Sequence, residues 1–321
     1  MRMFNSAAVF LVTLVTGTQL SAADLQWNQF RGPNGTGLAA DAKPPVEFDL
    51  KKNVRWSIKV PAGHSSPVIW GEKLFITGIT DGKFETLCID RDKGNVLWRT
   101  AAPQTELESF HRTSSAAAST PFVDAHRVYV YFGSFGLLCY DHQGKELWQH
   151  AVRTPQNMHG TATSPIVHKQ LVHLIHDSID GDSYVLAVNK ETGKLAWKTK
   201  RLVFNPNWST PVIWQTGKAD QLVVLDGGLL KAYVPSSGKE LWTVAEFGAP
   251  IPIPVVGDGI LYASATSGTD AGTNNSPLRW KFYVKYDKNK DGKVHTDEIP
   301  KRIFSCSTPT CRTAKCPRVP S

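Results

Sequence analysis

The stretch Asn189-Lys-Glu-Thr-Gly-Lys-Leu-Ala-Trp197 decides the fold of this chain, because its plan recurs. An acid or amide ends one apolar strand, a glycine lies in the turn that follows, and a tryptophan comes four residues after the glycine. A glycine between two short apolar runs is typical of a tight turn that joins antiparallel strands. The Gly-x-x-x-Trp part occurs at Gly94–Trp98, Gly144–Trp148, Gly193–Trp197 and Gly238–Trp242.

The residues that open each copy also share a plan. A hydroxyl residue followed by proline precedes an apolar strand, a turn and a second strand, and proline costs no ladder hydrogen bond at a strand start. Trp56 indicates the closing strand of an earlier unit, and a fifth opening, Pro252–Tyr262, reaches no matching tryptophan. The four hydroxyl-proline pairs are Ser66-Pro67, Thr120-Pro121, Ser164-Pro165 and Thr210-Pro211.

The length of the repeat predicts the architecture. Counting Trp56, the tryptophans lie 42, 50, 49 and 45 residues apart. A unit of about 45 residues with four short strands is one twisted antiparallel sheet, which cannot bury both faces alone and must stack on its neighbours. One tryptophan per unit supplies an apolar plug for each seam. We therefore expect an all-β fold, a β-propeller of four-stranded blades that is incomplete, with about five blades visible.

The repeat carries a family resemblance. The pattern Asp/Asn-x-x-x-Gly-x-x-x-Trp, present at Asp90–Trp98 and Asn189–Trp197, resembles the tryptophan-docking motif of PQQ-like propeller repeats. That superfamily includes quinoprotein alcohol dehydrogenases and BamB-like outer-membrane assembly proteins. The segments Trp27–Pro33 and Gly63–Pro67 are similar to exported PQQ-like proteins of environmental bacteria, planctomycetes especially. The resemblance places the propeller repeats at residues 24–265.

Two repeats depart from the pattern. One has a turn that is a residue shorter, Asp141 to Gly144, and one carries Val234-Pro235 where the acid should lie. For a quinoprotein, the resemblance would imply PQQ on the propeller axis, a vicinal cysteine pair over the quinone, a tryptophan beneath it and an Asp base beside Ca²⁺. The sequence has no adjacent cysteines, and no acid is marked as a base by its neighbours. PQQ is therefore not the expected cofactor.

These observations lead to two function hypotheses. We favour an exported, non-catalytic PQQ-like propeller scaffold that binds an envelope or extracellular protein or glycan. The alternative is a PQQ-dependent quinoprotein oxidoreductase that acts on an alcohol or sugar. Whether the chain is an enzyme stays open at this point, although the missing cysteine pair favours the scaffold.

Polar residues just before the blade-opening strands are candidates for a binding site. In propellers such loops often line one mouth of the central channel, where His and Arg can bind an anion or a metal. The alternative, which we favour, is that they bond to the backbone across the channel, because no His pair has a recognisable metal spacing. These residues are His64, His111, Arg112, His159, Asn207 and Trp208.

A calcium loop is predicted near the C-terminus. Residues 287–298 match the twelve-residue EF-hand loop, with Gly292 at the sharp turn, and Ser276-Pro277 indicates a helix start before it. We expect a short α-helical EF-hand element at residues 276–300, a lone hand whose exit helix Pro300 shortens or kinks. The expected Ca²⁺ ligands are Asp287, Asn289, Asp291, Lys293 through its carbonyl oxygen, and Glu298.

The two ends of the chain have a different character from the repeats. Residues 1–23 have the charge, apolar run and small residues of a cleavable signal peptide, cut near Ala23, which predicts a periplasmic or secreted protein. No later stretch is long enough for a transmembrane segment in the mature chain. Residues 301–321 form an irregular tail with Cys306, Cys311 and Cys316. We consider a disulfide or metal knuckle, a disordered tail, and, as the preferred hypothesis, a truncation or frame shift.

Composition limits the possible partners. The formal net charge is +8, but the basic residues are scattered and form no dense block, so nucleic acid is not an expected partner. Cys88 and Cys139 lie within apolar strand patterns, where we expect them to be small buried hydrophobic residues.

Overall fold

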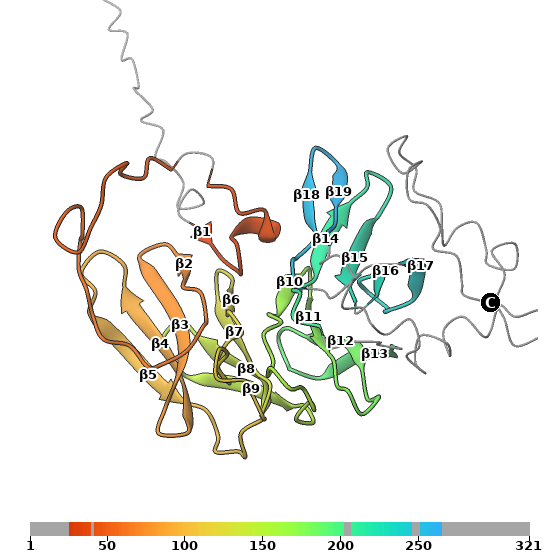
Figure 1. Cartoon of the computed structure of the whole chain (residues 1–321), viewed down its shortest axis with the longest axis horizontal. Coiled ribbons are helices and arrows are strands. Elements are labelled where there is room, and N and C mark those ends of the chain that lie inside the picture. The colour runs from red at the N-terminus through yellow and green to blue at the C-terminus, as the bar shows by residue number, and fades with distance from the viewer. Residues whose placement is uncertain (1–25, 40–41, 202–206, 227, 246–250, 265–321) are drawn as a thin grey trace, which may run out of the picture.

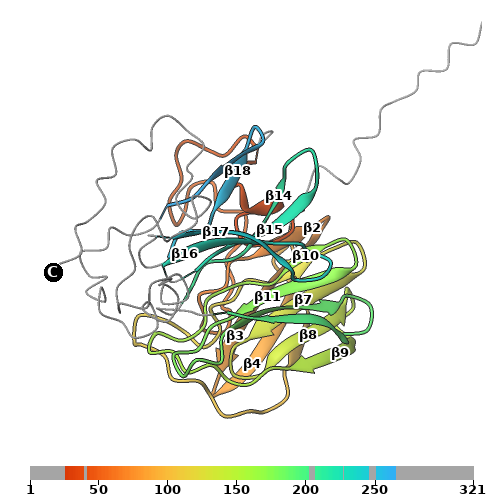
Figure 2. The ribbon, with the colours of Figure 1, turned by 90° about the vertical axis from the view of Figure 1, so that its right-hand side faces the viewer.

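The computed structural model describes residues 26–39, 42–201, 207–226, 228–245 and 251–264. Within these ranges the chain is all-β: no α-helix is present, and the one helical element is a short 3₁₀ turn, η2 (Pro33–Gly35). Four antiparallel sheets follow one another in chain order, three of them with four strands and the first with a fifth strand, β1, added at its edge (Figures 1 and 2). The predicted four-stranded blades are thus confirmed.

Every blade is built from four consecutive strands, each hydrogen-bonded to the next along the chain. Blade 1 contains β2 (Val68–Trp70), β3 (Lys73–Thr80), β4 (Lys83–Asp90) and β5 (Val96–Ala101). Blade 2 contains β6 (Phe122–Val123), β7 (Arg127–Phe132), β8 (Gly136–Asp141) and β9 (Glu146–Ala151). Blade 3 contains β10 (Ile166–His168), β11 (Leu171–His176), β12 (Tyr184–Asn189) and β13 (Leu195–Lys200). Blade 4 contains β14 (Val212–Gln215), β15 (Asp220–Leu225), β16 (Leu229–Tyr233) and β17 (Glu240–Ala245).

In blades 2 and 3 the two middle strands bury side chains on both faces, because a neighbouring sheet covers each face. The seam between blades 1 and 2 is an example, where Phe84 stacks on Phe132 with ring centroids 4.4 Å apart. Cys88 and Cys139 are fully buried free thiols in β4 and β8. Their predicted role as small core residues is confirmed.

The tryptophans fill the seams as expected. Each indole ring lies against the turn glycine of the next blade, and its Nε1 donates a hydrogen bond to a backbone carbonyl oxygen in the same turn, at 2.8 to 3.0 Å. A ring and a carbonyl placed in this way lock neighbouring blades together through both packing and a polar contact. The four pairs are Trp56 and Gly94, Trp98 and Gly144, Trp148 and Gly193, and Trp197 and Gly238.

The hydroxyl residues that precede the prolines form a second link between blades. The backbone N–H of Ser66 donates to Thr120 Oγ1, that of Thr120 donates to Ser164 Oγ, and that of Ser164 donates to Thr210 Oγ1, at 3.0 to 3.1 Å. Each blade therefore satisfies a backbone donor of the preceding one through the same position of the repeat. This explains why the position before the proline carries a hydroxyl group at Thr120, Ser164 and Thr210.

The N-terminal segment crosses to the far end of the row of blades. Strand β1 (Gln26–Trp27) pairs with β2, the Asn28 carbonyl accepts from the Val123 N–H, and η2 follows. Asn34 then bonds both backbone groups of Ile213 in blade 4, at 2.9 and 3.2 Å. Residues 26–35 thus tie blades 1, 2 and 4 together on the inner side.

Two predictions about the ends of the repeat region have different outcomes. The fifth opening forms a hairpin of β18 (Val255–Gly257) and β19 (Ile260–Tyr262), which lies beside β14. The expected closing strand at Asn53–Trp56 is wrong, because these residues belong to no strand in the described structure, although the Trp56 ring docks on Gly94 as predicted. The signal peptide, the EF-hand element and the cysteine tail lie outside the described residues.

Candidate functional site

The blades present two chemically different ends. Because strands alternate in direction, the long connections between blades emerge at the same end as the turns between second and third strands. We call this end the loop face; it carries residues 102–121, 152–165 and 207–211. The other end carries the turns between first and second strands and between third and fourth strands, and we call it the turn face.

Three aromatic rings form a row on the loop face. The rings of His111 and His159 are 5.3 Å apart between centroids, and those of His159 and Trp208 are 5.4 Å apart, both edge to face. Trp208 is held in place by a hydrogen bond of 3.0 Å from its Nε1 to the Gly160 carbonyl oxygen. The rings come from three consecutive loops, so the row crosses blades 2 to 4.

Exposed apolar side chains accompany this row. Phe110 precedes His111 and is 40% exposed, and Met158 precedes His159 and is 66% exposed. Rings together with a flexible thioether are typical of surfaces that bind other proteins. We refer to Phe110, His111, Met158, His159 and Trp208 as the ring row.

The remaining residues predicted at the mouth have simpler roles. Asn207 is buried, and its side chain donates to the Leu225 carbonyl oxygen and accepts from the Ser209 N–H, at 2.6 and 2.7 Å. Asn207 thus bonds to the backbone, but of its own loop and blade and not across the channel as expected. His64 donates its backbone N–H to Ala117, and Arg112 is exposed. The structure therefore joins His111, His159 and Trp208 and does not place the others in the row.

A buried acid lies under the ring row and was missed by the sequence analysis. Glu108 is 4% exposed; its carboxylate accepts from the Thr161 hydroxyl at 2.7 Å, and its N–H donates to Ser134 Oγ at 2.9 Å. Burial raises the pKa of Glu108 to about 7, an effect that the Thr161 hydrogen bond opposes. Gly133 was the sequence feature that could have indicated this buried acid, because a side chain at that position would collide with Glu108 and Thr161.

A buried charged cluster between blades 3 and 4 was also missed. The Arg201 guanidinium bonds the Asp177 carboxylate and lies 3.5 Å from Asp226 Oδ1, and all three side chains are almost completely buried. Burial raises the pKa of Asp177, against the attraction of Arg201. Since the acids follow β11 and β15 at matching positions, the cluster ties two blades together below the loop face.

The described residues do not fit a quinone site of the kind the resemblance implied. The required cysteine pair would have to be adjacent, and the two cysteines described here, Cys88 and Cys139, are buried in the cores of different blades. Within the described ranges there is also no group of three or more His, Cys, Asp or Glu side chains that could hold a metal ion. The predicted calcium ligands, Asp287 to Glu298, lie outside these ranges.

The family of the chain follows from its repeats. A comparison with protein families matches residues 11–198 and 181–276 to the family described as outer membrane protein assembly factor BamB. The chain belongs to this family. The docked tryptophans and the hydroxyl links are therefore features of a BamB-family propeller, and the predicted PQQ-like resemblance is confirmed at this level.

Individual relatives are distant. The chain is 26% identical to the outer membrane protein assembly factor BamB of Yersinia pestis over 269 residues, which is 74% of this chain and 63% of that protein. BamB from Moraxella catarrhalis is 20% identical, with a TM-score of 0.46 over 67% of this chain and 58% of that structure. The quinohemoprotein alcohol dehydrogenase ADHIIG from Pseudomonas putida HK5 is 16% identical, with a TM-score of 0.49 over 72% and 42%. The chain thus spans less than two thirds of the length of each of these relatives.

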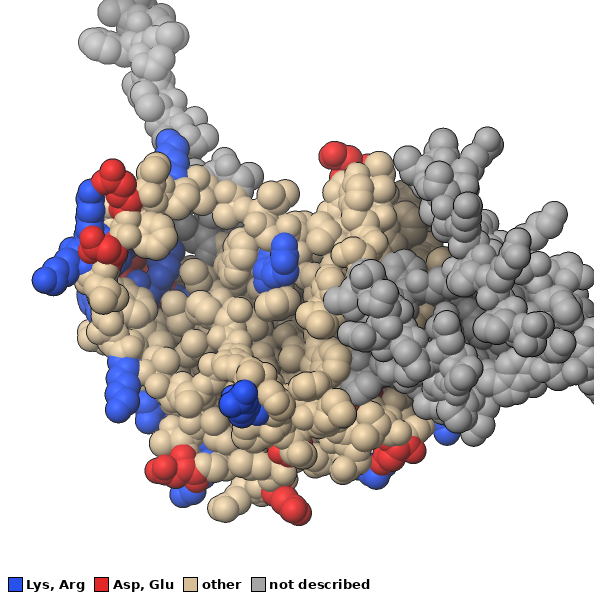
Figure 3. Space-filling view, in the orientation of Figure 1, with Lys and Arg blue, Asp and Glu red and all other residues tan. Residues whose placement is uncertain are grey.

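Charged side chains of both signs are present on the surface of the molecule. On the face shown in Figure 3, the Lys and Arg side chains lie mostly along the rim, with Asp and Glu among them. No helix in the described part of the chain has the length and hydropathy needed to cross a membrane.

Proposed function

We propose that this chain is a non-catalytic BamB-family scaffold of the bacterial envelope that binds a partner protein through the ring row on its loop face. The observation that carries the proposal is the convergence of His111, His159 and Trp208 from three consecutive loops. These rings have no packing role between the sheets, whose seams are already filled by the docked tryptophans. Their exposure beside Phe110 and Met158 fits contact with another molecule.

The position of the row supports a protein rather than a small molecule as the partner. It crosses three blades and lies at the surface, so it offers a wide patch rather than an enclosed pocket. Aromatic residues and methionine are enriched in protein interfaces, where they supply large apolar contact areas. A glycan that stacks on Trp208 is the other ligand that such rings could hold, and the experiment below distinguishes the two.

The relationship to BamB supports an envelope partner. BamB of Yersinia pestis is described as an outer membrane protein assembly factor, and we propose a comparable setting for this chain. The signal-peptide pattern of residues 1–23 is consistent with export. The EF-hand pattern of residues 287–298 adds one Ca²⁺ ion, which we propose has a structural role.

Site-specific crosslinking in cells tests the proposal. A photoreactive amino acid at Met158, which is 66% exposed, should crosslink to an envelope protein. The matched control places it at Lys93, an exposed residue in a turn of blade 1 on the turn face, where we expect no crosslink to the same protein. Substituting Ala for both His111 and His159 should remove the Met158 crosslink without lowering the melting temperature.

Three results would overturn the proposal. Equal crosslinks from Met158 and Lys93 would mean that the loop face has no special role. Binding of a glycan array that depends on Trp208, with no protein crosslink, would make the partner a glycan. Dye-linked alcohol oxidation after addition of PQQ to the purified chain would show that the protein is an enzyme.

A further inference from the structure

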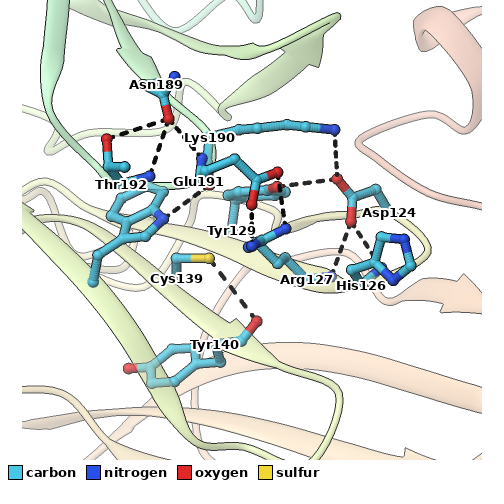
Figure 4. A network of polar contacts seen from close by, with 11 residues as sticks. Asp124, His126, Arg127, Tyr129, Cys139, Tyr140, Asn189, Lys190, Glu191 and Thr192 are labelled. Carbon is cyan, nitrogen blue, oxygen red and sulfur yellow. Dashed lines mark hydrogen bonds and ion pairs between the residues drawn. The ribbon is translucent and has the colours of Figure 1, made fainter.

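The seam between blades 2 and 3 is closed on the turn face by two ion pairs. Arg127, the first residue of β7, bonds Glu191 in the turn of blade 3, with Nη1 at 3.0 Å from Oε1. Lys190, the residue before Glu191, lies 3.6 Å from the Asp124 carboxylate. Figure 4 shows both pairs reaching across the seam.

The seam between blades 1 and 2 is closed at the same place. Lys73 occupies the position of Arg127, since it opens β3 and pairs with the acid that ends the following strand. Its ammonium group donates to the His142 carbonyl oxygen at 2.7 Å. In both of these seams a long cationic side chain therefore covers the junction.

The seam between blades 3 and 4 has lost these residues. The register places Leu171 where blades 1 and 2 have Lys73 and Arg127. The turn of blade 4 begins at Val234, so Pro235 and Ser236 occupy the positions of Lys190 and Glu191. Neither ion pair can form with these side chains. The irregular repeat at Val234-Pro235 thus has a structural consequence at this seam.

A groove lies at this seam, where Leu171 and Pro235 replace the long charged side chains of the other seams, and the contacts of His168 and Lys169 with Asp220 lie at its border. It has a volume of about 670 Å³ and is bordered by three turns, at residues 168–171, 215–220 and 234–236. Its apolar lining includes Leu171, Val234 and Pro235. A volume of this size falls in the range of known ligand sites, which is about 300 to 1,000 Å³. Exposed residues such as Gly217 and Ala219 form its outer border, so the groove is open to solvent.

The charged groups around the groove are mainly basic. Lys169 and Lys218 lie on its border, and Lys169 has 75% of its side chain exposed. Asp220 is the acid in the lining; its carboxylate lies 3.0 Å from His168 Nε2 and 3.1 Å from Lys169 Nζ. Two ammonium groups against one carboxylate leave a local excess of positive charge above an apolar floor.

We propose that this groove binds a short, extended, acidic peptide segment of a partner protein, with apolar side chains on Leu171 and Pro235 and carboxylates facing Lys169 and Lys218. The groove is open to solvent and lies between turns of two neighbouring blades, which suits a peptide laid across the seam better than an enclosed small molecule. It lies on the turn face, opposite the ring row. The proposal rests on the proposed scaffold function in so far as it takes a protein as the ligand.

Fluorescence anisotropy with labelled peptides tests the groove directly. The probes are three hexapeptides in which Leu alternates with Asp, with Ser or with Lys, titrated with the purified full chain. We expect saturable binding of the Asp-Leu peptide that is at least tenfold tighter than that of the Ser-Leu peptide, with the Lys-Leu peptide weakest. Succinate in excess should not displace the Asp-Leu peptide; displacement would identify a small-anion site and overturn the peptide proposal.

Charge reversal locates the binding. The double variant Lys169→Glu and Lys218→Glu should weaken binding of the Asp-Leu peptide at least tenfold. The matched control, Lys83→Glu and Lys93→Glu, makes the same change in net charge on exposed residues of blade 1 and should leave the affinity unchanged. If both double variants lose the same affinity, the effect is one of overall charge and the proposal is contradicted. The proposal is also contradicted if the unmodified chain shows no saturable binding.

Restoring the missing ion pair gives an independent test. Leu171→Arg with Ser236→Glu recreates the pair that Arg127 and Glu191 make in the neighbouring seam. This variant should fill the groove and abolish peptide binding, and a melting temperature close to that of the parent chain would show that it folds. If the folded variant still binds the Asp-Leu peptide, the peptide does not bind in the groove and the proposal is wrong.

The two proposals can fail separately. Substituting Ala for both His111 and His159 on the loop face should leave the affinity for the Asp-Leu peptide unchanged. If these substitutions abolish peptide binding and the groove variants do not, the peptide binds at the ring row and the groove proposal is wrong. If crosslinking at Met158 fails while the groove binds peptide, the proposed role of the ring row is wrong and the groove proposal is supported.

Discussion

The indole of Trp148 in blade 2 lies against the backbone of Gly193 in blade 3, so close that a Cβ atom on Gly193 would be 2.6 Å from the ring. Gly193 also has a φ of +68°, a conformation that L side chains rarely adopt. The two requirements coincide in one residue. The glycine of the repeat is thus needed both for the turn and for the close approach of the next blade.

Substitution of this glycine should therefore lower the free energy of unfolding more than substitution of a glycine that is needed only for a turn. We expect Gly193→Ala to lower the free energy of unfolding by about 3 kcal/mol, from the left-handed conformation and from the collision with Trp148. Gly217→Ala is the matched control, because φ is +78° there and no atom lies within 4 Å of the added Cβ. It should cost about 1 kcal/mol. Urea denaturation followed by tryptophan fluorescence measures both, and equal losses would refute a packing role for the glycine.

The hydroxyl links between blades give a second prediction. Ser164→Ala leaves the buried N–H of Thr120 without its acceptor, and we expect a loss of about 1 to 3 kcal/mol in the free energy of unfolding. Ser164→Thr keeps the oxygen, and threonine already occupies the matching positions Thr120 and Thr210. This variant should stay within about 0.5 kcal/mol of the parent chain in the same urea assay. A loss in Ser164→Thr as large as in Ser164→Ala would point to packing instead of the hydrogen bond.

Glu108 predicts a pH dependence of stability. Its pKa rises from the ordinary 4.5 to about 7 on folding, so between these values the folded state binds more protons than the unfolded state. The free energy of unfolding should therefore decrease as pH rises through this window, by about 3 kcal/mol in total. Glu108→Gln removes this contribution, and the stability gained by the variant should grow from about pH 5 to about pH 8.

The comparison with the variant is needed because other groups titrate in the same range. His173 and His176 are buried with pKa values lowered to about 4, so their contribution to stability is lost as pH falls from their ordinary value of 6.5. Their effect on the pH dependence of stability is opposite to that of Glu108. The contribution of Glu108 is therefore obtained from the difference in free energy of unfolding between Glu108→Gln and the parent chain. A difference that does not change with pH would show that Glu108 keeps an ordinary pKa.

The predicted calcium loop can be tested by calorimetry. We expect saturable Ca²⁺ binding at one site that is lost in Glu298→Gln, because the bidentate carboxylate at the last loop position closes an EF-hand. Affinity should be modest, with a Kd of about 10⁻⁴ to 10⁻³ M, as in extracellular modules. Lys293→Ala is the control, since that residue offers only its backbone carbonyl oxygen and should bind as the parent does. Binding that survives in Glu298→Gln would place the ion elsewhere.

The fold was predictable in most respects because its signals are local. The glycine turn, the hydroxyl-proline opening and the tryptophan recur within one repeat, and alternation within a strand fixes its register. Trp56 shows where local reasoning failed. Its ring docks on Gly94 as the repeat predicts, but a strand also needs a hydrogen-bonded neighbour, and within the described residues Asn53–Trp56 pairs with none.

The amino-acid sequence by itself thus determined the blades and the tryptophan in each seam, because the turn, strand and tryptophan signals recur within every repeat. Only the tertiary structure decided which loops meet. His111, His159 and Trp208 are almost 50 residues apart in sequence and become neighbours through the rotation from one blade to the next. The same holds for the groove beside Leu171, which exists because a side chain in one blade and a turn in the next both depart from the repeat. The sequence shows each irregular position of the repeat separately, whereas the packing of blade 3 on blade 4 places the two positions side by side.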